Sequence, residues 1–157
     1  MADWIKIVGG SNTSPYTQAT HDGWDRRYVW FPGKGTSVAA GDRLFLYTGH
    51  PLRKLFCICR VLEDPSVSIN AQEGLHLRCR VQPLLTLSDL RTYGVDAGSV
   101  FPLPGGARLV SLRQKSHMQI EDDDAVRLTT HLVAALAREL LASEPPVQST
   151  LFPETRS

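Results

Sequence analysis

The sequence predicts one α+β domain, in which a small curled β-sheet is followed by a long helix. Three observations predict this class. The apolar runs are mostly short and strand-like, they follow one another directly along the chain, and only residues 122–142 have a sustained helical period. Strands that adjoin in sequence favour an antiparallel or mixed sheet, and about six of them suffice for a barrel. We expect the domain over residues 1–142 and a disordered tail over residues 143–157.

The rest of the chain is expected to be organised around residues 38–49. Gly41 and Asp42 are a turn signal, because glycine tolerates positive φ and aspartate hydrogen-bonds to its own backbone. Residues 43–48 then have the aromatic and branched composition of a buried strand. We expect this strand to form one wall of the barrel.

Further strands are expected on both sides of this wall, over residues 4–8, 27–31, 55–63, 75–84 and 108–112. The strand over 75–84 alternates most regularly, so that Leu77, Cys79 and Val81 should face the core while Arg78 and Arg80 face solvent or phosphates. Residues 11–20, 66–74 and 95–106 are predicted as loops, and residues 114–118 as a polar connection.

Two helices are expected. The short one spans residues 88–94, with Ser88 as its N-cap and Gly94 as its stop. The long one spans Asp122–Ala142, where a face of spaced apolar residues is predicted to pack on the barrel (Leu128, Leu132, Val133, Leu136, Leu140 and Leu141). The acidic run over residues 121–124 suits the positive end of the helix dipole better than a metal site.

Composition excludes several classes of protein. The 17 basic and 16 acidic residues give a net charge of +1, so any nucleic acid must be bound by a local patch. Cys57, Cys59 and Cys79 lie in strand-like runs without metal-ligand spacing, and we expect buried thiols and neither a metal nor a cofactor. No apolar stretch reaches the roughly 18 residues of a membrane span, so we expect no membrane partner and a cytoplasmic location.

The sequence contains no catalytic signature, but its aromatic residues predict a binding pocket. Trp24, Tyr28, Trp30 and Phe31 fall within eight residues, which exceeds what one strand face can bury. Together with Tyr47 they can supply stacking surfaces for a flat ligand. The polar residues that would contact the edge of that ligand are Ser11, Asn12 and Thr48. The alternative is that these aromatic residues are part of the core.

The order of these elements resembles the EVE domain of the PUA-like superfamily, which also includes the YTH and ASCH domains. The resemblance covers about residues 3–142 and is carried by short motifs, which are residues 9–12, 41–47, 55–61, 81–85 with 87–90, and 112–120. It implies a pseudo-β-barrel with flanking helices and a cage that accepts a flipped-out modified base. By position, Ser11 and Asn12 match the polar residues after the family's first strand, Trp24 or Trp30 matches a cage aromatic, and Tyr47 matches the end of the strand that follows the Gly-Asp corner.

The sequence therefore predicts a non-catalytic module that recognises a modified base, such as a methylated one, in DNA more than in RNA. The resemblance places the connection Arg113–His117 near the nucleic-acid backbone. Basic residues are expected to hold the phosphates, with His117 beside them (Arg26, Arg27, Lys34, Arg53, Lys54, Arg113 and Lys115).

Two alternatives remain open. An ASCH-like enzyme acting on nucleic acid or nucleosides would need a reactive group in the pocket, for which Lys6, Lys34 and Tyr47 are the candidates. An interaction adaptor would act through the tail, where Gln148, Leu151 and Phe152 belong to a segment that resembles the peptide by which bacterial proteins bind the DNA-polymerase sliding clamp.

Overall fold

One curled sheet forms the body of the protein. The structure is a computed structural model that describes residues 1–8, 27–32, 36–50, 52–70, 74–103 and 116–143. The strands run in the order β2-β6-β4-β3-β1-β8, with β5 paired to β6 and β7 paired to β4. Their bounds are Asp3–Val8 (β1), Tyr28–Pro32 (β2), Arg43–Thr48 (β3), Lys54–Val61 (β4), Ser66–Asn70 (β5), Gly74–Thr86 (β6), Val95–Asp96 (β7) and His117–Ile120 (β8).

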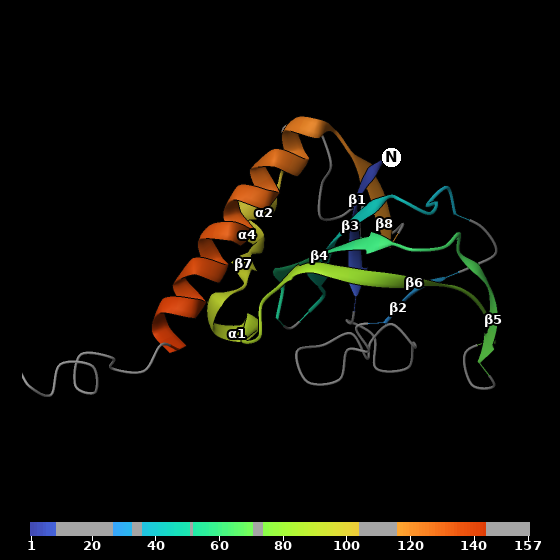
Figure 1. Cartoon of the computed structure of the whole chain (residues 1–157), viewed down its shortest axis with the longest axis horizontal. Helices are drawn as coiled ribbons and strands as arrows, with labels where there is room; N and C mark the ends of the chain where they lie inside the picture. Colours follow the sequence, from blue (N-terminus) through green and yellow to red (C-terminus); the bar gives the residue numbers. More distant parts are fainter. Residues whose placement is uncertain (9–26, 33–35, 51, 71–73, 104–115, 144–157) are drawn as a thin grey trace, which may run out of the picture.

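The helices gather on one side of this sheet, and β5 lies at its opposite end (Figure 1). They are α1 (Leu90–Tyr93), α2 (Ala97–Val100) and α4 (Asp122–Ser143). The α+β class and the curled sheet with a long C-terminal helix are therefore as the sequence predicts. Within the described part, no helix is long and apolar enough to cross a membrane.

The Gly41–Asp42 corner anchors the middle of the sheet. The Asp42 carboxylate accepts hydrogen bonds from the backbone N–H groups of Ala2 and Ala39, at 2.8 and 3.0 Å, and from the indole N–H of Trp4 at 3.0 Å. Gly41 has φ of 92°, a left-handed conformation that glycine adopts without strain. The corner therefore ties the start of β1 to the start of β3, which run parallel to each other.

The alternation predicted for residues 75–84 is confirmed where side chains are described. Leu77, Cys79 and Val81 are buried, whereas Arg80 is exposed and Arg78 half-buried. Cys57 and Cys59 are buried free thiols as well, like Cys79. Side chains of this inner face therefore fill the interior of the curled sheet.

Three segments expected as loops or connections contain strands or helix. Residues 66–70 form β5, a hairpin partner of β6. Residues 95–100 form β7, which pairs with β4, and the single turn α2. Residues 117–120 form β8, antiparallel to β1. In each case pairing with another strand, the neighbouring β6 or the more distant β4 or β1, overrides a polar or Gly-containing local sequence.

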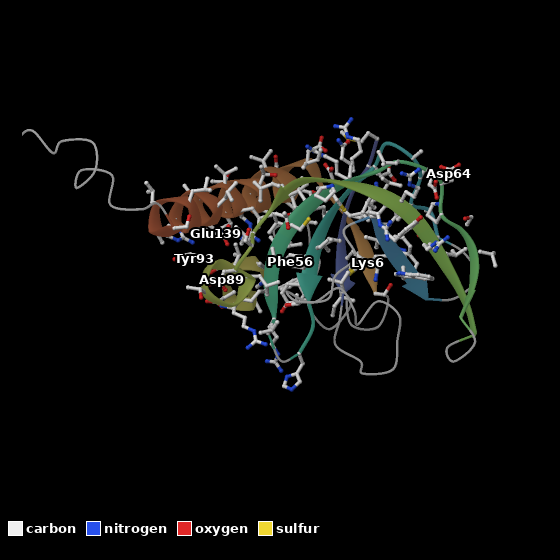
Figure 2. All side chains as sticks on the ribbon, turned by 60° about the horizontal axis from the view of Figure 1, so that its bottom comes forward. Lys6, Phe56, Asp64, Asp89, Tyr93 and Glu139 are labelled. Carbon is white, nitrogen blue, oxygen red and sulfur yellow. The ribbon has the colours of Figure 1, made fainter. Side chains whose placement is uncertain are left out.

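The N-cap of α1 is Asp89 and not Ser88. The Asp89 carboxylate accepts a hydrogen bond from the N–H of Thr92 at 3.2 Å. Glu139, buried on α4, accepts hydrogen bonds from the N–H groups of Ser88 at 3.1 Å and Asp89 at 2.6 Å. Figure 2 shows Asp89 and Glu139 together at the helical end of the molecule. This contact fixes α1 against α4.

The long helix buries only part of the apolar face that the sequence predicts. Leu128 and Leu132 are fully buried and Leu136 is half-buried. Val133, Leu140 and Leu141 point to solvent, with exposed fractions of 52%, 59% and 72%. The correction follows from geometry, because one sheet covers a single helix stripe, here 125–128–132–135–139, and the next stripe stays outside.

The predicted strand over 108–112 lies outside the described residues. Of the predicted tail over 143–157 only Ser143 is described, and it is the last residue of α4.

Two leucine substitutions on α4 test this assignment of faces. Leu132→Ala should lower the free energy of unfolding by about 2–5 kcal/mol, because it leaves a cavity against the sheet. Leu140→Ala, the matched control on the open face, should change it by less than about 0.5 kcal/mol. Urea denaturation measures both values. Equal losses for the two variants would contradict the assignment.

Candidate functional site

A cluster of polar side chains lies inside the sheet, where β1 and β8 meet β2. We call it the amine–imidazole cluster, and it consists of Lys6, Phe31, Thr36, Ser116 and His117. Lys6 and His117 are directly opposite each other in the antiparallel register of β1 and β8. Figure 2 shows Lys6 among the strands, away from the helices that carry Asp89 and Glu139.

The Lys6 amine is buried in apolar surroundings. Its side chain has an exposed fraction of 0%, and its Nζ donates a hydrogen bond to the Ile7 carbonyl at 2.6 Å. The same Nζ lies 5.3 Å from the centroid of the Phe31 ring, within the range of a cation–π contact. Burial lowers the pKa of the amine from 10.5 to about 7, while the nearby Cys79 acts in the opposite direction. Near neutral pH the amine therefore exists in both the charged and the uncharged form.

His117 completes the cluster and is held by two hydroxyl groups. Its Nε2 lies 2.8 Å from the Thr36 hydroxyl, and its Nδ1 lies 3.0 Å from the Ser116 hydroxyl. Its ring contacts Phe31 edge-on with centroids 4.9 Å apart, and Trp4 at 5.6 Å. Burial, and after it the charge of Lys6, lower the pKa of His117 to about 4. The imidazole is therefore neutral at physiological pH, with one nitrogen that donates and one that accepts.

The backbone explains how β8 brings these groups together. Ser116 has φ of 66°, which is uncommon for a residue with a side chain. Its carbonyl accepts a hydrogen bond from the Ile7 N–H at 2.8 Å, so the turn into β8 is fastened to β1. The same turn brings the Ser116 hydroxyl beside the ring that follows it.

This arrangement brings together the kinds of group that bind a polar, flat ligand. An amine and an imidazole with pKa values displaced by burial, together in one cluster, are typical of functional sites, although structural networks also produce them. Their N–H groups can donate to carbonyl oxygens, and their uncharged nitrogens can accept. Phe31 supplies an aromatic surface beside them. Within the described part of the chain, no three His, Cys, Asp or Glu side chains come together as a metal site.

The four described aromatics of the predicted pocket do not converge, and only Tyr28 and Trp30 share a side, beside Arg78. Phe31 faces the interior and contacts Lys6 and His117. Trp30, the preceding residue of β2, faces the other side, where it lies 5.3 Å from the Arg78 guanidinium. Tyr47 is fully buried and packs edge-on against Phe101, with centroids 5.3 Å apart. These residues thus occupy three separate environments.

Three other predicted site residues take part in local contacts around the β3–β4 turn. The Thr48 hydroxyl is buried and accepts a hydrogen bond from the Lys54 N–H at 2.9 Å. The Lys54 amine forms an ion pair with Asp96. Arg53 is exposed and has φ of 51°, with its guanidinium 3.5 Å from His50. None of the three contacts the amine–imidazole cluster in the described part of the structure.

Several predicted site residues lie outside the described residues, which are Ser11, Asn12, Trp24, Arg26, Lys34, Arg113 and Lys115. Of the residues that form the cluster, the sequence singled out Phe31 and His117 for binding, and Lys6 only as a candidate of the enzyme alternative. One signal points to Lys6. It shares a strand face with Trp4 and Val8, so that a charged residue stands between two apolar residues that both face the interior.

A second concavity lies where α4 begins. It has a volume of about 370 Å³ and is lined by Asp3, Arg43, Asp122, Ala125, Val126, Thr129 and Thr130. The Arg43 guanidinium spans it with two hydrogen bonds to the Asp3 carboxylate, at 2.7 and 3.0 Å. Because its charged groups already satisfy each other, this groove is a weaker candidate than the amine–imidazole cluster.

The chain is similar to three solved structures. The NMR structure of Rpa0253 from Rhodopseudomonas palustris has a TM-score of 0.58 and 12% identity, over 85% of this chain and 94% of that chain. The crystal structure of Atu2648 from Agrobacterium tumefaciens has a TM-score of 0.56 and 12% identity, over 83% and 93%. A variant of ZmASCH from Zymomonas mobilis has a TM-score of 0.57 and 6% identity, over 82% and 95%. No protein-family model and no curated protein sequence matches the chain.

The chain has a PUA-like α+β fold. This follows from the similarity to ZmASCH over nearly the whole of both chains, and it agrees with the fold predicted from sequence. At identities of 12% or less the likeness concerns the fold alone.

Lys6→Met is expected to stabilise the protein at neutral pH. The unfolded chain keeps a proton on Lys6 up to about pH 10.5, whereas the folded chain releases it above about pH 7. The folded state binds fewer protons in this window, so the contribution of Lys6 is destabilising below pH 7 and fades as the pH rises toward 10.5. The variant should be more stable at pH 7 by several kcal/mol, on the order of 4–5, because the pKa of Lys6 falls from 10.5 to about 7 and one pKa unit corresponds to about 1.4 kcal/mol.

Urea denaturation of both proteins at several pH values measures this difference. The advantage of Lys6→Met should shrink steadily from pH 7 to pH 10. An advantage that stays constant over this range would contradict a lowered pKa of Lys6.

The same variant should change the titration of His117. Removing the Lys6 charge removes one of the two causes that lower the pKa of His117, while burial remains. The pKa of His117 should therefore rise above about 4 and stay below 6.5. Histidine ring resonances followed by NMR between pH 3 and 8 measure it. An unchanged pKa would mean that the two groups do not interact.

Proposed function

We propose that the chain is a non-catalytic nucleic-acid-binding module that accepts one extruded base at the amine–imidazole cluster. One observation carries this proposal, namely that a buried amine and a neutral imidazole face the same aromatic ring. For this, both groups must exchange a present hydrogen-bond partner for the edge of a base whose face contacts Phe31. The partner exchanged is the Thr36 or Ser116 hydroxyl for His117 and the Ile7 carbonyl for Lys6. The PUA-like fold supports the proposal, since ASCH proteins belong to the same superfamily as the base-binding EVE and YTH domains.

The burial of the cluster limits how a base could reach it. Lys6 and Phe31 have exposed fractions of 0%, whereas His117 is half-buried. A base must therefore approach past His117, and the atoms that cover Lys6 must move aside. An added methyl group on the base would increase affinity for such a confined, partly apolar site. Recognition of a modified base in DNA is therefore part of the proposal. Membership of the EVE family is likewise part of the proposal.

A binding experiment tests this function. Fluorescence anisotropy compares oligonucleotides of one sequence, with and without a methylated base, on the unaltered chain and on Lys6→Met. The unaltered chain should prefer the modified strand, and the variant should lose about tenfold or more of that preference, as expected for a hydrogen bond to a chargeable group. Arg138→Met, a matched change on the exposed surface of α4, should keep the preference.

Two results would contradict the proposal. One is equal affinity of the unaltered chain for both strands, and the other is an equal preference in the Lys6→Met variant.

One observation favours an enzyme as a second candidate. An amine with a pKa of about 7 is reactive at neutral pH, and in this structure it lies in a cluster with the Ser116 hydroxyl and His117. Turnover of modified nucleosides by the purified chain, abolished by Lys6→Met, would select this candidate over a binding module. Tight binding without turnover would exclude it for the nucleosides tested.

Contact with a sliding clamp remains a separate proposal. It rests on the sequence of residues 148–152 alone, which lie outside the described residues. Deleting residues 145–157 should abolish binding to a purified clamp and leave oligonucleotide binding unchanged.

A further inference from the structure

A basic and aromatic surface lies on the outer face of the sheet, opposite the interior that holds the amine–imidazole cluster. We call it the arginine–aromatic surface, and it consists of Arg27, Tyr28, Trp30, Arg60, Arg78 and Arg80. The register of the sheet makes it continuous. Tyr28 pairs with Arg80 and Trp30 with Arg78, so β2 and β6 contribute to the same face. Arg60 of β4 pairs with Gln82, two residues from Arg80 on that face.

Cation–π contacts organise the centre of this surface. The Arg78 guanidinium lies 4.3 Å from the centroid of the Tyr28 ring and 5.3 Å from that of Trp30. Arg27 lies 5.8 Å from the Tyr28 ring. Two guanidinium groups therefore lie within cation–π distance of aromatic rings, and such a pair can bind a phosphate through the guanidinium while a base stacks on the ring.

Three of the arginines on this surface, Arg60, Arg78 and Arg80, are not seen in an ion pair within the described part of the chain. The side chains next to these arginines on the same face by register are Arg43, Leu62, Ser66 and Gln82, none of which is acidic. Arg43 lies opposite Arg60 and forms an ion pair with Asp3, the next residue across the sheet. The whole chain carries a net charge of only +1, so this is a local concentration of positive charge.

The position of β2 connects this surface with the cluster. β2 is the terminal strand in the order of the described sheet, and its adjacent residues Phe31 and Trp30 face opposite sides. A strand of nucleic acid that passes around this edge can present one base to the interior and keep its backbone and neighbouring bases outside.

We propose that the arginine–aromatic surface binds the backbone and flanking bases of a single-stranded nucleic acid. Arg60, Arg78 and Arg80 contact phosphates, and Tyr28 and Trp30 stack with bases. The inference rests on the proposed function, since it supplies the binding surface for the strand whose base enters the cluster. The charge favours a polyanion, and the interleaved aromatic rings favour nucleic acid over an acidic peptide.

The salt dependence of binding to an unmodified single-stranded oligonucleotide tests this surface. Arg60→Gln combined with Arg80→Gln should weaken binding about tenfold at low salt, and should reduce the slope of log affinity against log salt by about 1.4 for the two phosphates lost. Trp30→Leu should weaken binding while leaving that slope unchanged, because it removes stacking and no charge. The matched control, Arg91→Gln combined with Arg138→Gln, lowers the net charge equally on the exposed surface of the helices and should leave both quantities unchanged.

The outcomes separate this inference from the proposed function. A salt slope that Arg60→Gln and Arg80→Gln leave unchanged overturns the surface alone, as does an equal effect of the control pair. Polyaspartate is compared with an oligonucleotide of the same charge as a competitor. If both compete equally well, the surface binds acidic protein segments, and nucleic acid is overturned as its partner. Failure of the unaltered chain to bind any oligonucleotide overturns both.

Discussion

The hydrogen bonds to the Asp42 carboxylate determine where the first strand lies. Burial acts to raise the pKa of Asp42, but hydrogen bonds from the N–H groups of Ala2 and Ala39 and from the Trp4 indole outweigh it and keep the pKa below its ordinary value. The carboxylate is therefore charged when it binds the start of β1. Because β1 lies between β3 and β8, its position sets both registers at once, and with them the placement of Lys6 opposite His117.

The amine–imidazole cluster conflicts with the rest of the core. Side chains around it are apolar, and an apolar residue at position 6 would fill the interior without the cost of burying an amine. Proteins retain such destabilising groups mostly where they serve a function. The same holds for His117. Packing does not require an imidazole at this position, yet the hydroxyls of Thr36 and Ser116 lie within hydrogen-bond distance of both its nitrogens.

The sequence predicts the parts of the fold whose local pattern and tertiary role agree. The strand over 43–48 and the alternation around Cys79 are examples, because a turn signal or a period of two defines them. The sequence does not predict β8 (His117–Ile120). Its segment has a largely polar local pattern, and it forms a strand because it pairs with β1. Closeness in sequence predicts that the aromatic residues line one pocket. Trp30 and Phe31, however, are adjacent on one strand, and adjacent residues of a strand face opposite sides of the sheet. The cluster itself joins residues more than a hundred positions apart, and nothing local in the sequence marks that meeting.

The most direct test of the central claim is NMR of the lysine ε-carbon resonances, with the Lys6 signal assigned by its absence in Lys6→Met. This signal should titrate near pH 7, and it should shift more on addition of a single-stranded oligonucleotide that carries a methylated base than on addition of the unmodified strand. A Lys6 signal that titrates near pH 10.5 and does not respond to either strand would contradict it.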